Sequence, residues 1–192
     1  MCGGGDWNSG TSGMDLRSSC TLILDDLTQQ TWKDLPSNIA FHAMTTLNNP
    51  DKSILLTGGI ETPTTQTAFA NATTTAWLLR QPGKDSTWEQ LPDMQFARAA
   101  HRIVATNDGG AIVFGGSNRM GPGYPADFTS VECAEVFDLD TLSFTPIDTC
   151  IAAGAGPDPV FALHPNHEML LFGNRTLSNG DGAIGSIPVN AN

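Results

Sequence analysis

The stretch ARAAHRIVATNDGGAIVFGG at residues 97–116, followed after a loop by AEVFDLDTLSF at residues 134–144, decides the fold of this chain. HRIVAT and the apolar AIVF predict two strands joined by the turn NDGG, because an Asp-Gly step readily adopts positive φ. ECAEVFD and LSFTPI predict a third and a fourth strand, the fourth at an edge because it contains Pro146. The stretch therefore predicts one four-stranded antiparallel sheet.

The order apolar strand, paired glycine, loop and aromatic strand recurs along the chain. Trp32, Trp88 and Phe144 follow one another at a constant spacing of 56 residues. Markers that recur with a fixed step indicate a repeated supersecondary unit whose copies stack on one another. The glycines that end the apolar runs are Gly4 and Gly5, Gly58 and Gly59, Gly115 and Gly116, and Gly173, which Asn174 follows.

The remaining pattern of the chain is all-β. Short runs rich in Val, Ile, Thr and aromatic residues alternate with turn residues, and no 12-residue segment shows helical apolar spacing. A single four-stranded sheet cannot bury both of its faces, whereas sheets that stack radially as propeller blades can. The sequence therefore predicts a partial β-propeller of about three to three and a half four-stranded blades.

These units resemble the kelch repeat, in which a paired glycine precedes an aromatic in the third strand and a tryptophan further on. The resemblance places the chain with the kelch-repeat β-propellers of the galactose oxidase and kelch-like superfamily, over residues 2 to about 174. It implies that the glycine pairs and large aromatics serve blade stacking. The aromatics that carry the match are Trp77 and Trp88 in one unit, Phe137 and Phe144 in the next, and Trp32 in the first.

The repeat sets the expected domain boundaries. We expect an incomplete first blade at about 1–36, a second blade at 41–92 and a third at 100–147. A partial fourth blade is expected at 159–174, and residues 175–192 form an irregular tail or an incomplete blade. Only Met1 and Cys2 precede the first glycines, which predicts a chain that starts within a strand and is a fragment. Too few blades to close a ring leave open sheet edges, which predict self-association.

Charge and hydropathy exclude some classes of partner. The chain carries a net charge of −11, and its nine basic residues form no run. Binding to a nucleic-acid backbone needs clustered Lys and Arg, so we expect no nucleic-acid partner. No apolar stretch approaches the roughly 20 residues of a membrane helix, so no membrane span is expected in this segment.

The resemblance also implies an enzymatic alternative, because some kelch-type propellers are copper enzymes of the galactose oxidase and glyoxal oxidase kind. Their site needs two tyrosines, one of them cross-linked to a cysteine, and two histidines. This chain has one tyrosine, Tyr124. His42 and His101 occupy matching places in the expected first strands of successive units, where structural roles are the simpler interpretation. We therefore expect no catalytic residue, no metal and no cofactor in this chain.

The four cysteines predict either two local disulfides or four free, buried thiols. Cys133 and Cys150 lie at opposite ends of one hairpin, and Cys2 and Cys20 lie where a second strand ends and a third begins. Cys20 and Cys133 are too far apart in the repeat to bridge. Two such disulfides would indicate an oxidising compartment.

Two Asn-X-Thr triplets are candidate glycosylation sites, at Asn71 and Asn174. Both fall in loops between second and third strands, where a glycan fits. The triplets favour a secreted or extracellular protein over a cytoplasmic one, although the compartment stays open at this point.

The long loops between second and third strands, at residues 6–18, 60–72 and 117–130, are expected to cluster on one rim of the ring. Aromatic anchors in adaptable loops suit a binding surface. The alternative that Phe128 tucks under its own loop stays open. The candidate binding residues on this rim are Trp7, Tyr124 and Phe128.

These observations favour a non-catalytic scaffold that binds a protein or a carbohydrate. The rival hypothesis is a fragment of a galactose oxidase-like copper enzyme whose catalytic residues lie outside this chain. The identity of the ligand does not follow from the sequence.

Overall fold

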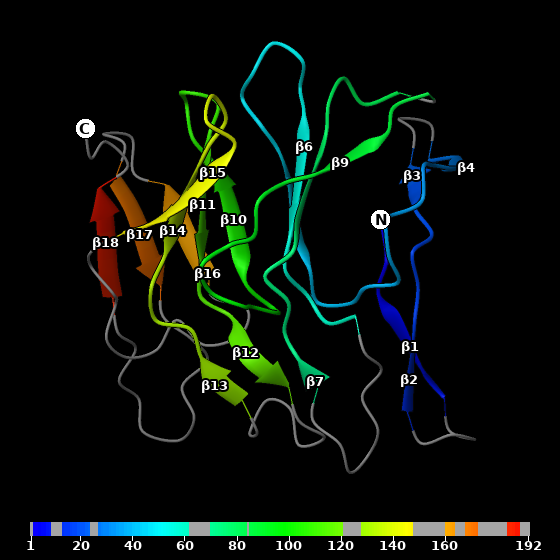
Figure 1. Ribbon diagram of the computed structural model, residues 1–192, viewed down its shortest axis with the longest axis horizontal. Coiled ribbons are helices and arrows are strands. Elements are labelled where there is room, and N and C mark those ends of the chain that lie inside the picture. Colours follow the sequence, from blue (N-terminus) through cyan, green and yellow to red (C-terminus); the bar gives the residue numbers. More distant parts are fainter. Residues whose placement is uncertain are drawn as a thin grey trace.

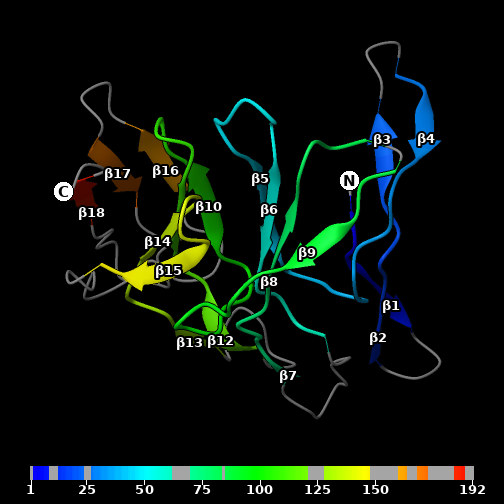
Figure 2. The ribbon, with the colours of Figure 1, turned by 45° about the horizontal axis from the view of Figure 1, so that its top comes forward.

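The computed structural model describes residues 2–8, 13–23, 27–61, 70–83, 85–120, 128–147, 160–163, 168–172 and 184–188. Every regular element within these residues is a β-strand, and the sheets stand side by side along an arc (Figure 1). The view in Figure 2 separates them as successive blades. The prediction of an all-β, partial propeller is confirmed.

Two blades have all four strands. The second blade has the sheet order β5-β6-β8-β9 and the third has β10-β11-β14-β15, with every neighbouring pair antiparallel. The second strands β6 and β11 are almost wholly buried, because other blades or loops cover both of their faces. The bounds are β5 (Ala43–Thr46), β6 (Ile54–Thr57), β8 (Ala76–Leu79), β9 (Trp88–Gln90), β10 (Arg102–Ala105), β11 (Ala111–Phe114), β14 (Glu135–Asp138) and β15 (Ser143–Pro146).

The first strands β5 and β10 contact each other, whereas the fourth strands β9 and β15 do not. The two sheets therefore share an inner edge and diverge outwards, which is the geometry of propeller blades. Apolar side chains fill the wedge between them. Leu55 and Leu78 of the second blade pack with Ile103, Phe137 and Phe144 of the third, and each fully buried side chain of this size contributes about 1.5–3 kcal/mol.

The two ends of the arc hold smaller sheets. At one end β3 (Thr21–Ile23) pairs with β4 (Gln29–Thr31), and a bridge joins Cys2 to Cys20 beside them. At the other end β16 (Val160–Leu163), β17 (Glu168–Phe172) and β18 (Ile184–Pro188) form a three-stranded sheet. β18 lies in the segment expected to be an irregular tail or an incomplete blade, and it pairs with β17 at the place of a third strand.

The segments expected to be long loops contain strands of their own. β1 (Gly5–Asn8) and β2 (Gly13–Leu16) form a hairpin, and β12 (Ser117–Met120) pairs with β13 (Phe128–Ser130). β12 also pairs with β7 (Ala70–Asn71), which comes from the preceding blade. All five strands lie at the lower end of the blades in Figure 1. We call this end the rim.

The paired glycines join one blade to the next. Gly58 and Gly59 have φ values of 55° and 105°. The N–H of Gly58 donates to Thr75 within its own blade, and that of Gly59 donates to the carbonyl of Arg98 at the entry to the third blade, at 2.8 Å. A Cβ on Gly58 would collide with this same carbonyl. Both the backbone conformation and the close approach therefore require glycine.

In the first blade the positive-φ pair falls on Gly3 and Gly4, and Gly5 opens β1 instead. This is one residue earlier than the sequence pattern indicated. Gly4 donates to the carbonyl of Ile39 at 2.8 Å, which repeats the bond of Gly59 to Arg98. In the third blade Gly115 and Gly116 both have positive φ, while Gly173 lies outside the described residues.

The third-strand aromatics Trp77 and Phe137 do not occupy equivalent positions in their blades, whereas the fourth-strand aromatics do. Trp88 faces Leu79 as Phe144 faces Phe137, so these two fourth-strand aromatics share one position. Trp77 faces Leu56 and Gln90, a register two residues from that of Phe137.

Trp32 is also displaced from the repeat. Its N–H donates to Cys20, as the N–H of Leu91 donates to Ala76, so Trp32 takes the place of Leu91 rather than of Trp88. The N–H of Leu35 likewise donates to Ser18 as that of Met94 donates to Thr74, so the constant spacing of 56 residues does not reflect structural equivalence at its first step.

Replacing Gly58 with alanine should destabilise the chain by about 3 kcal/mol, because the new Cβ is strained at positive φ and meets the Arg98 carbonyl. Urea unfolding followed by tryptophan fluorescence measures the loss. Gly83→Ala is the matched control, since a Cβ at Gly83 meets no atom closer than 3.6 Å. Equal stability of the two variants would contradict the role given to Gly58.

Candidate functional site

The rim rests on one apolar floor to which the first three blades contribute. Met14 comes from the first blade, Ala70 from the second and Met120 from the third, and all three pack in one cluster with Ile60 and Ala99. The pairs Arg119–Asn71 and Met120–Ala70 join β12 to β7 across the blade boundary. Strand pairing and a shared floor hold the rim as one surface rather than as separate loops.

The candidate binding residues fall on this surface, as far as the structure describes them. Trp7 lies in β1 opposite Met14, and Phe128 opens β13 opposite Met120. Tyr124 lies outside the described residues. Their role in binding stays a prediction.

Asn71 is exposed at the end of β7, beside Arg119 on the neighbouring strand. It stays a predicted glycosylation site, and Asn174 lies outside the described residues. Cys2 and Cys20 form a disulfide, so the first glycine pair is tied covalently to β3. Cys133 is disulfide-bonded as well, and its expected partner Cys150 lies outside the described residues.

A buried ion pair supports the rim from beneath, and no motif in the sequence indicated it. Arg98 and Glu135 lie 2.9 Å apart, and both side chains are fully buried. Arg98 also donates to the carbonyls of Gly115 and Cys133, and Glu135 accepts from the backbone N–H of Gln95. Burial lowers the pKa of Arg98, and its hydrogen bond and charge contact with Glu135 act in the opposite direction. The pair ties the segment between the blades to the third blade.

Each of the first two glycine pairs lies against a histidine that precedes a first strand, His42 near Gly3 and His101 near Gly58. The Nε2 atom of His101 is 2.8 Å from the hydroxyl of Thr57, and His101 is completely buried. Burial lowers the pKa of His101 well below 6.5, and the charge of Arg98 adds to the effect. Burial lowers the pKa of His42 to about 4. Both imidazoles are therefore neutral at pH 7 and serve packing between blades.

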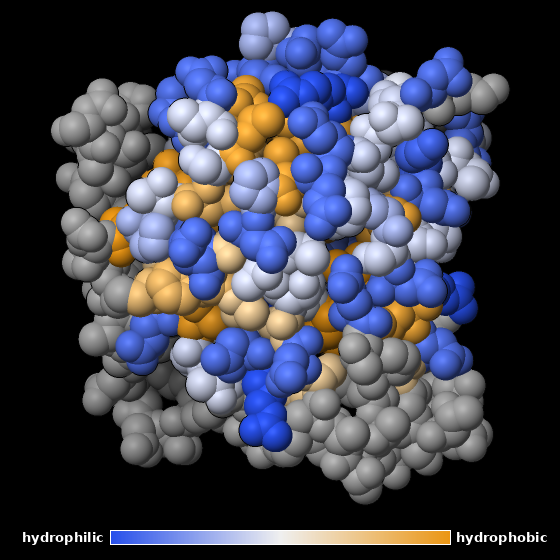
Figure 3. Space-filling view, viewed as in Figure 1, coloured by the Kyte–Doolittle hydropathy of each residue, from blue (hydrophilic) through white to orange (hydrophobic). Residues whose placement is uncertain are grey.

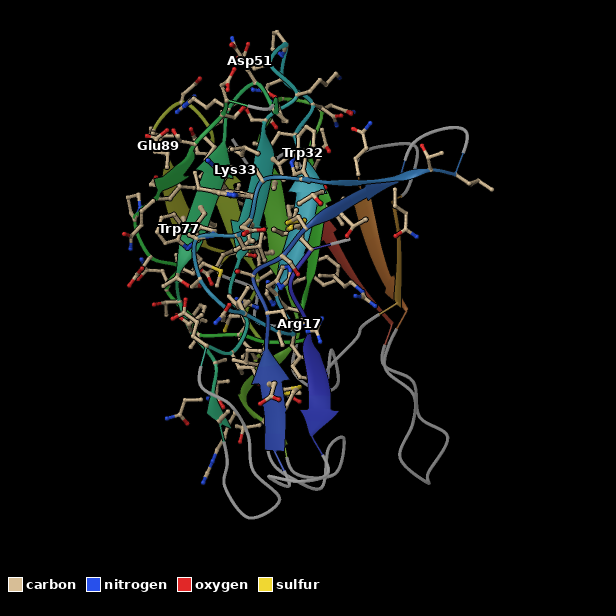
Figure 4. The ribbon with its side chains drawn as sticks, turned by 90° about the vertical axis from the view of Figure 1, so that its right-hand side faces the viewer. Arg17, Trp32, Lys33, Asp51, Trp77 and Glu89 are labelled. Carbon is tan, nitrogen blue, oxygen red and sulfur yellow. A yellow bond between two sulfur atoms is a disulfide. The ribbon has the colours of Figure 1, made fainter. Side chains whose placement is uncertain are left out.

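A groove lies between the first and second blades, at the end opposite the rim. Its volume is about 570 Å³. Figure 4 shows Trp32 and Asp51 towards this end, away from β1 and β2. The indole N–H of Trp88 donates to the carbonyl of Asp34 at 3.0 Å, which links the two blades. The lining residues are Cys2, Thr21, Trp32, Met44, Thr46, Asp51, Lys52, Ile54, Gln81, Pro82 and Trp88.

Sequence reasoning assigned both groove tryptophans to blade stacking and so missed the groove. No local motif indicates it, because its lining residues come from separate segments of two blades. Elsewhere, Figure 3 shows hydrophilic residues over much of the visible face, with smaller apolar areas among them. Among the residues with described side chains, no cluster of three or more His, Cys, Asp or Glu side chains suits a metal ion.

Comparison with known proteins agrees with this geometry. The chain is similar to an F-box/kelch-repeat protein of Arabidopsis thaliana, with 28% identity over 88 residues, or 46% of the chain. Its structure is similar to that of a fungal alcohol oxidase of the AA5 family in complex with copper, with a TM-score of 0.66 over 85% of the chain and 18% identity. The fold is that of a kelch-type, galactose oxidase-like β-propeller.

No protein-family profile matches the chain. The propeller segment spans 19% of the plant relative and 34% of the fungal oxidase, so it corresponds to a minor part of each. Within the described part of the chain, no helix is long and apolar enough to span a bilayer.

The lowered pKa values of His42 and His101 predict acid sensitivity. Each is neutral when folded and protonates near pH 6.5 when unfolded, so stability is full above pH 6.5 and falls as the pH drops towards 4. At pH 5 the loss should be about 2 kcal/mol for His42. Urea midpoints at pH 7 and pH 5 measure it, and His42→Gln should flatten the dependence. Identical midpoints for the wild-type chain at both pH values would contradict the burial of these imidazoles.

Proposed function

We propose that this chain is a non-catalytic kelch-type propeller segment whose rim binds a protein or a carbohydrate. The observation that carries the proposal is the shared floor beneath β2, β7 and β12, where Met14, Ala70 and Met120 meet. A surface built on packed strands loses little conformational entropy when a partner docks, so contacts made on it contribute efficiently to affinity.

The position of the rim strands supports the same function. Each rim segment starts directly after a glycine pair, with β1 following Gly4 and β12 following Gly116. The carbonyls of these two glycines accept the N–H of Arg17 and of Val131, which closes the base of each segment. Sequence changes above that base leave the blades intact, which suits a surface that adapts to different partners. The similarity to an F-box/kelch-repeat protein favours a protein partner.

The structural similarity to the fungal alcohol oxidase in complex with copper favours a second candidate function. Under this alternative the chain is a fragment of a galactose oxidase-like enzyme. The resemblance implies a site with two tyrosines and two histidines. The chain has one tyrosine, Tyr124, so further catalytic residues would have to lie outside it. The gene sequence on either side of this segment, and Cu(II) titration of its full-length product by calorimetry, separate the two candidates, because only the enzyme supplies the second tyrosine there and a stoichiometric high-affinity copper site.

The rim proposal predicts that replacing Trp7 and Tyr124 together with alanine weakens partner binding at least tenfold while leaving the melting temperature within a few degrees. Loss of two aromatic anchors commonly costs more than 1 kcal/mol each. Probes selected with the wild-type chain from a glycan array and a displayed peptide library provide the binding assay.

Leu27→Ala is the control for this experiment, since Leu27 is 80% exposed and lies away from the rim. It should leave binding unchanged. Selected probes that bind the Trp7/Tyr124 double variant as tightly as the wild-type chain would contradict a rim-based function.

A further inference from the structure

A small pocket lies between the second and third blades, where the rim strands β12 and β13 meet the segment that joins the two blades. Its volume is about 370 Å³. Small-ligand sites run from roughly 300 to 1,000 Å³, so a pocket of this size suits one long side chain rather than a folded segment. The sheets on both sides of it have all four strands. Its walls include Gln95, Phe96, Asn118, Ser130 and Glu132.

The wall that carries Phe96 is held in place by the buried ion pair. Glu135 accepts from the backbone N–H groups of Gln95 at 2.6 Å and of Phe96 at 3.2 Å, and it also pairs with Arg98. The Cζ atom of Arg98 lies over the Phe96 ring, 5.7 Å from its centre. Glu135 balances the charge of Arg98, so the ion pair fixes the ring without adding net positive charge beside the pocket. Phe96 nevertheless remains partly exposed.

The opposite wall, residues 131–133, is also anchored at both ends. The N–H of Val131 donates to the carbonyl of Gly116 at 2.9 Å, and the carbonyl of Cys133 accepts from Arg98 at 2.7 Å. Glu132 lies between these two bonds, and its side chain is exposed. A pocket whose two walls are already fixed loses little conformational entropy when a ligand enters, which favours binding.

The blade repeat does not account for Phe96. Because Leu35 and Met94 make equivalent backbone bonds, Ser37 takes the place of Phe96 at the boundary between the first and second blades. The hydroxyl of Ser37 donates to the carboxylate of Glu61 at 2.9 Å and fills no wedge between sheets. Stacking of the blades therefore does not require an aromatic at this place, and a partly exposed one suits contact with a partner.

Glu132 gives the pocket its charge. Among the described residues that line it, Glu132 alone is charged, and Cys133 is held in a disulfide. Asn118 of β12 lines the pocket, so the alternation of side chains along a strand directs the neighbouring Arg119 to the other face. The whole chain has a net charge of −11, which attracts a cation from a longer range. The pocket therefore favours a cationic ligand.

We propose that this pocket binds the guanidinium side chain of an arginine supplied by a partner protein. A guanidinium is planar, stacks on aromatic rings and donates two parallel hydrogen bonds to a carboxylate, so it satisfies Phe96 and Glu132 together. The side-chain oxygens of Gln95, Asn118 and Ser130 can accept its remaining N–H groups. A lysine ammonium pairs with the carboxylate but lacks the planar face. The site borders the rim, but the proposal does not rest on the function proposed for the rim.

Titration of N-acetylarginine methylamide into the full, ¹⁵N-labelled chain tests the proposal by NMR. The amide signals of Phe96, Asn118 and Glu132 should shift with one saturable midpoint. The citrulline analogue has the same shape without the charge and should bind at least tenfold more weakly, and the lysine analogue at least threefold more weakly. The midpoint for arginine should rise at least threefold between about 50 and about 500 mM NaCl, because salt screens exposed charges.

The variant Glu132→Gln removes the carboxylate while keeping the size of the side chain, and it should weaken arginine binding at least tenfold. Asp140→Asn is the matched control, because Asp140 is exposed in the turn after β14 and its replacement removes the same charge. It should leave the midpoint within twofold. Phe96→Leu should weaken binding at least threefold through loss of the ring face. Circular dichroism melts establish that the variants are folded, and the exposed Glu132 carries the test if Phe96→Leu does not fold.

The proposal fails if the arginine and citrulline analogues bind equally well, or if a folded Glu132→Gln variant binds arginine unchanged. Absence of saturable shifts at the pocket amides would also overturn it. Tighter binding of methyl glucoside at the same amides would assign the pocket to a carbohydrate instead. The signals come from the pocket walls and no probe is selected on the rim, so failure of the rim proposal remains distinguishable from failure of this one.

Discussion

The structure depends on a backbone hydrogen bond that Gly4 and Gly59, the second glycines of the first two pairs, donate to the blade that follows. Gly4 reaches Ile39 and Gly59 reaches Arg98 in this way. The bond fixes the angle between successive sheets, because it forms only when the chain turns at positive φ against the neighbouring backbone. The same turn directs the chain into the rim, so blade stacking and the placement of the rim strands have one origin.

Residues around this turn show how polar groups are accommodated at a blade boundary. His101 lies against Gly58 and meets the hydroxyl of Thr57, while Arg98 and Glu135 pair with each other and hydrogen-bond several backbone groups in full burial. Removing one member of such a pair leaves an uncompensated charge, which is far more costly than the pair itself. The boundary between the second and third blades is therefore specified by polar geometry as well as by apolar packing.

Local patterns in the sequence predicted the complete blades well, because strand periodicity, Asp-Gly turns and glycine pairs act over a few residues. The third blade follows its expected strands closely, from β10 to β15. Features that depend on distant partners were not predictable in this way. The pairing of β7 with β12 joins loops of different blades, and no local pattern specifies that register. Trp32 matches the spacing of the repeat but not its place in the sheet, because its N–H donates to Cys20 as that of Leu91 donates to Ala76.

The most direct test of this account is the hydrogen-exchange rate of the Gly59 amide measured by NMR. If the bond to Arg98 holds the blades together, this amide exchanges as slowly as the central-strand amides of β6, although it lies outside any strand. Exchange at the rate of an open turn, while β6 stays protected, would show that the blades do not depend on this contact and would contradict the central claim.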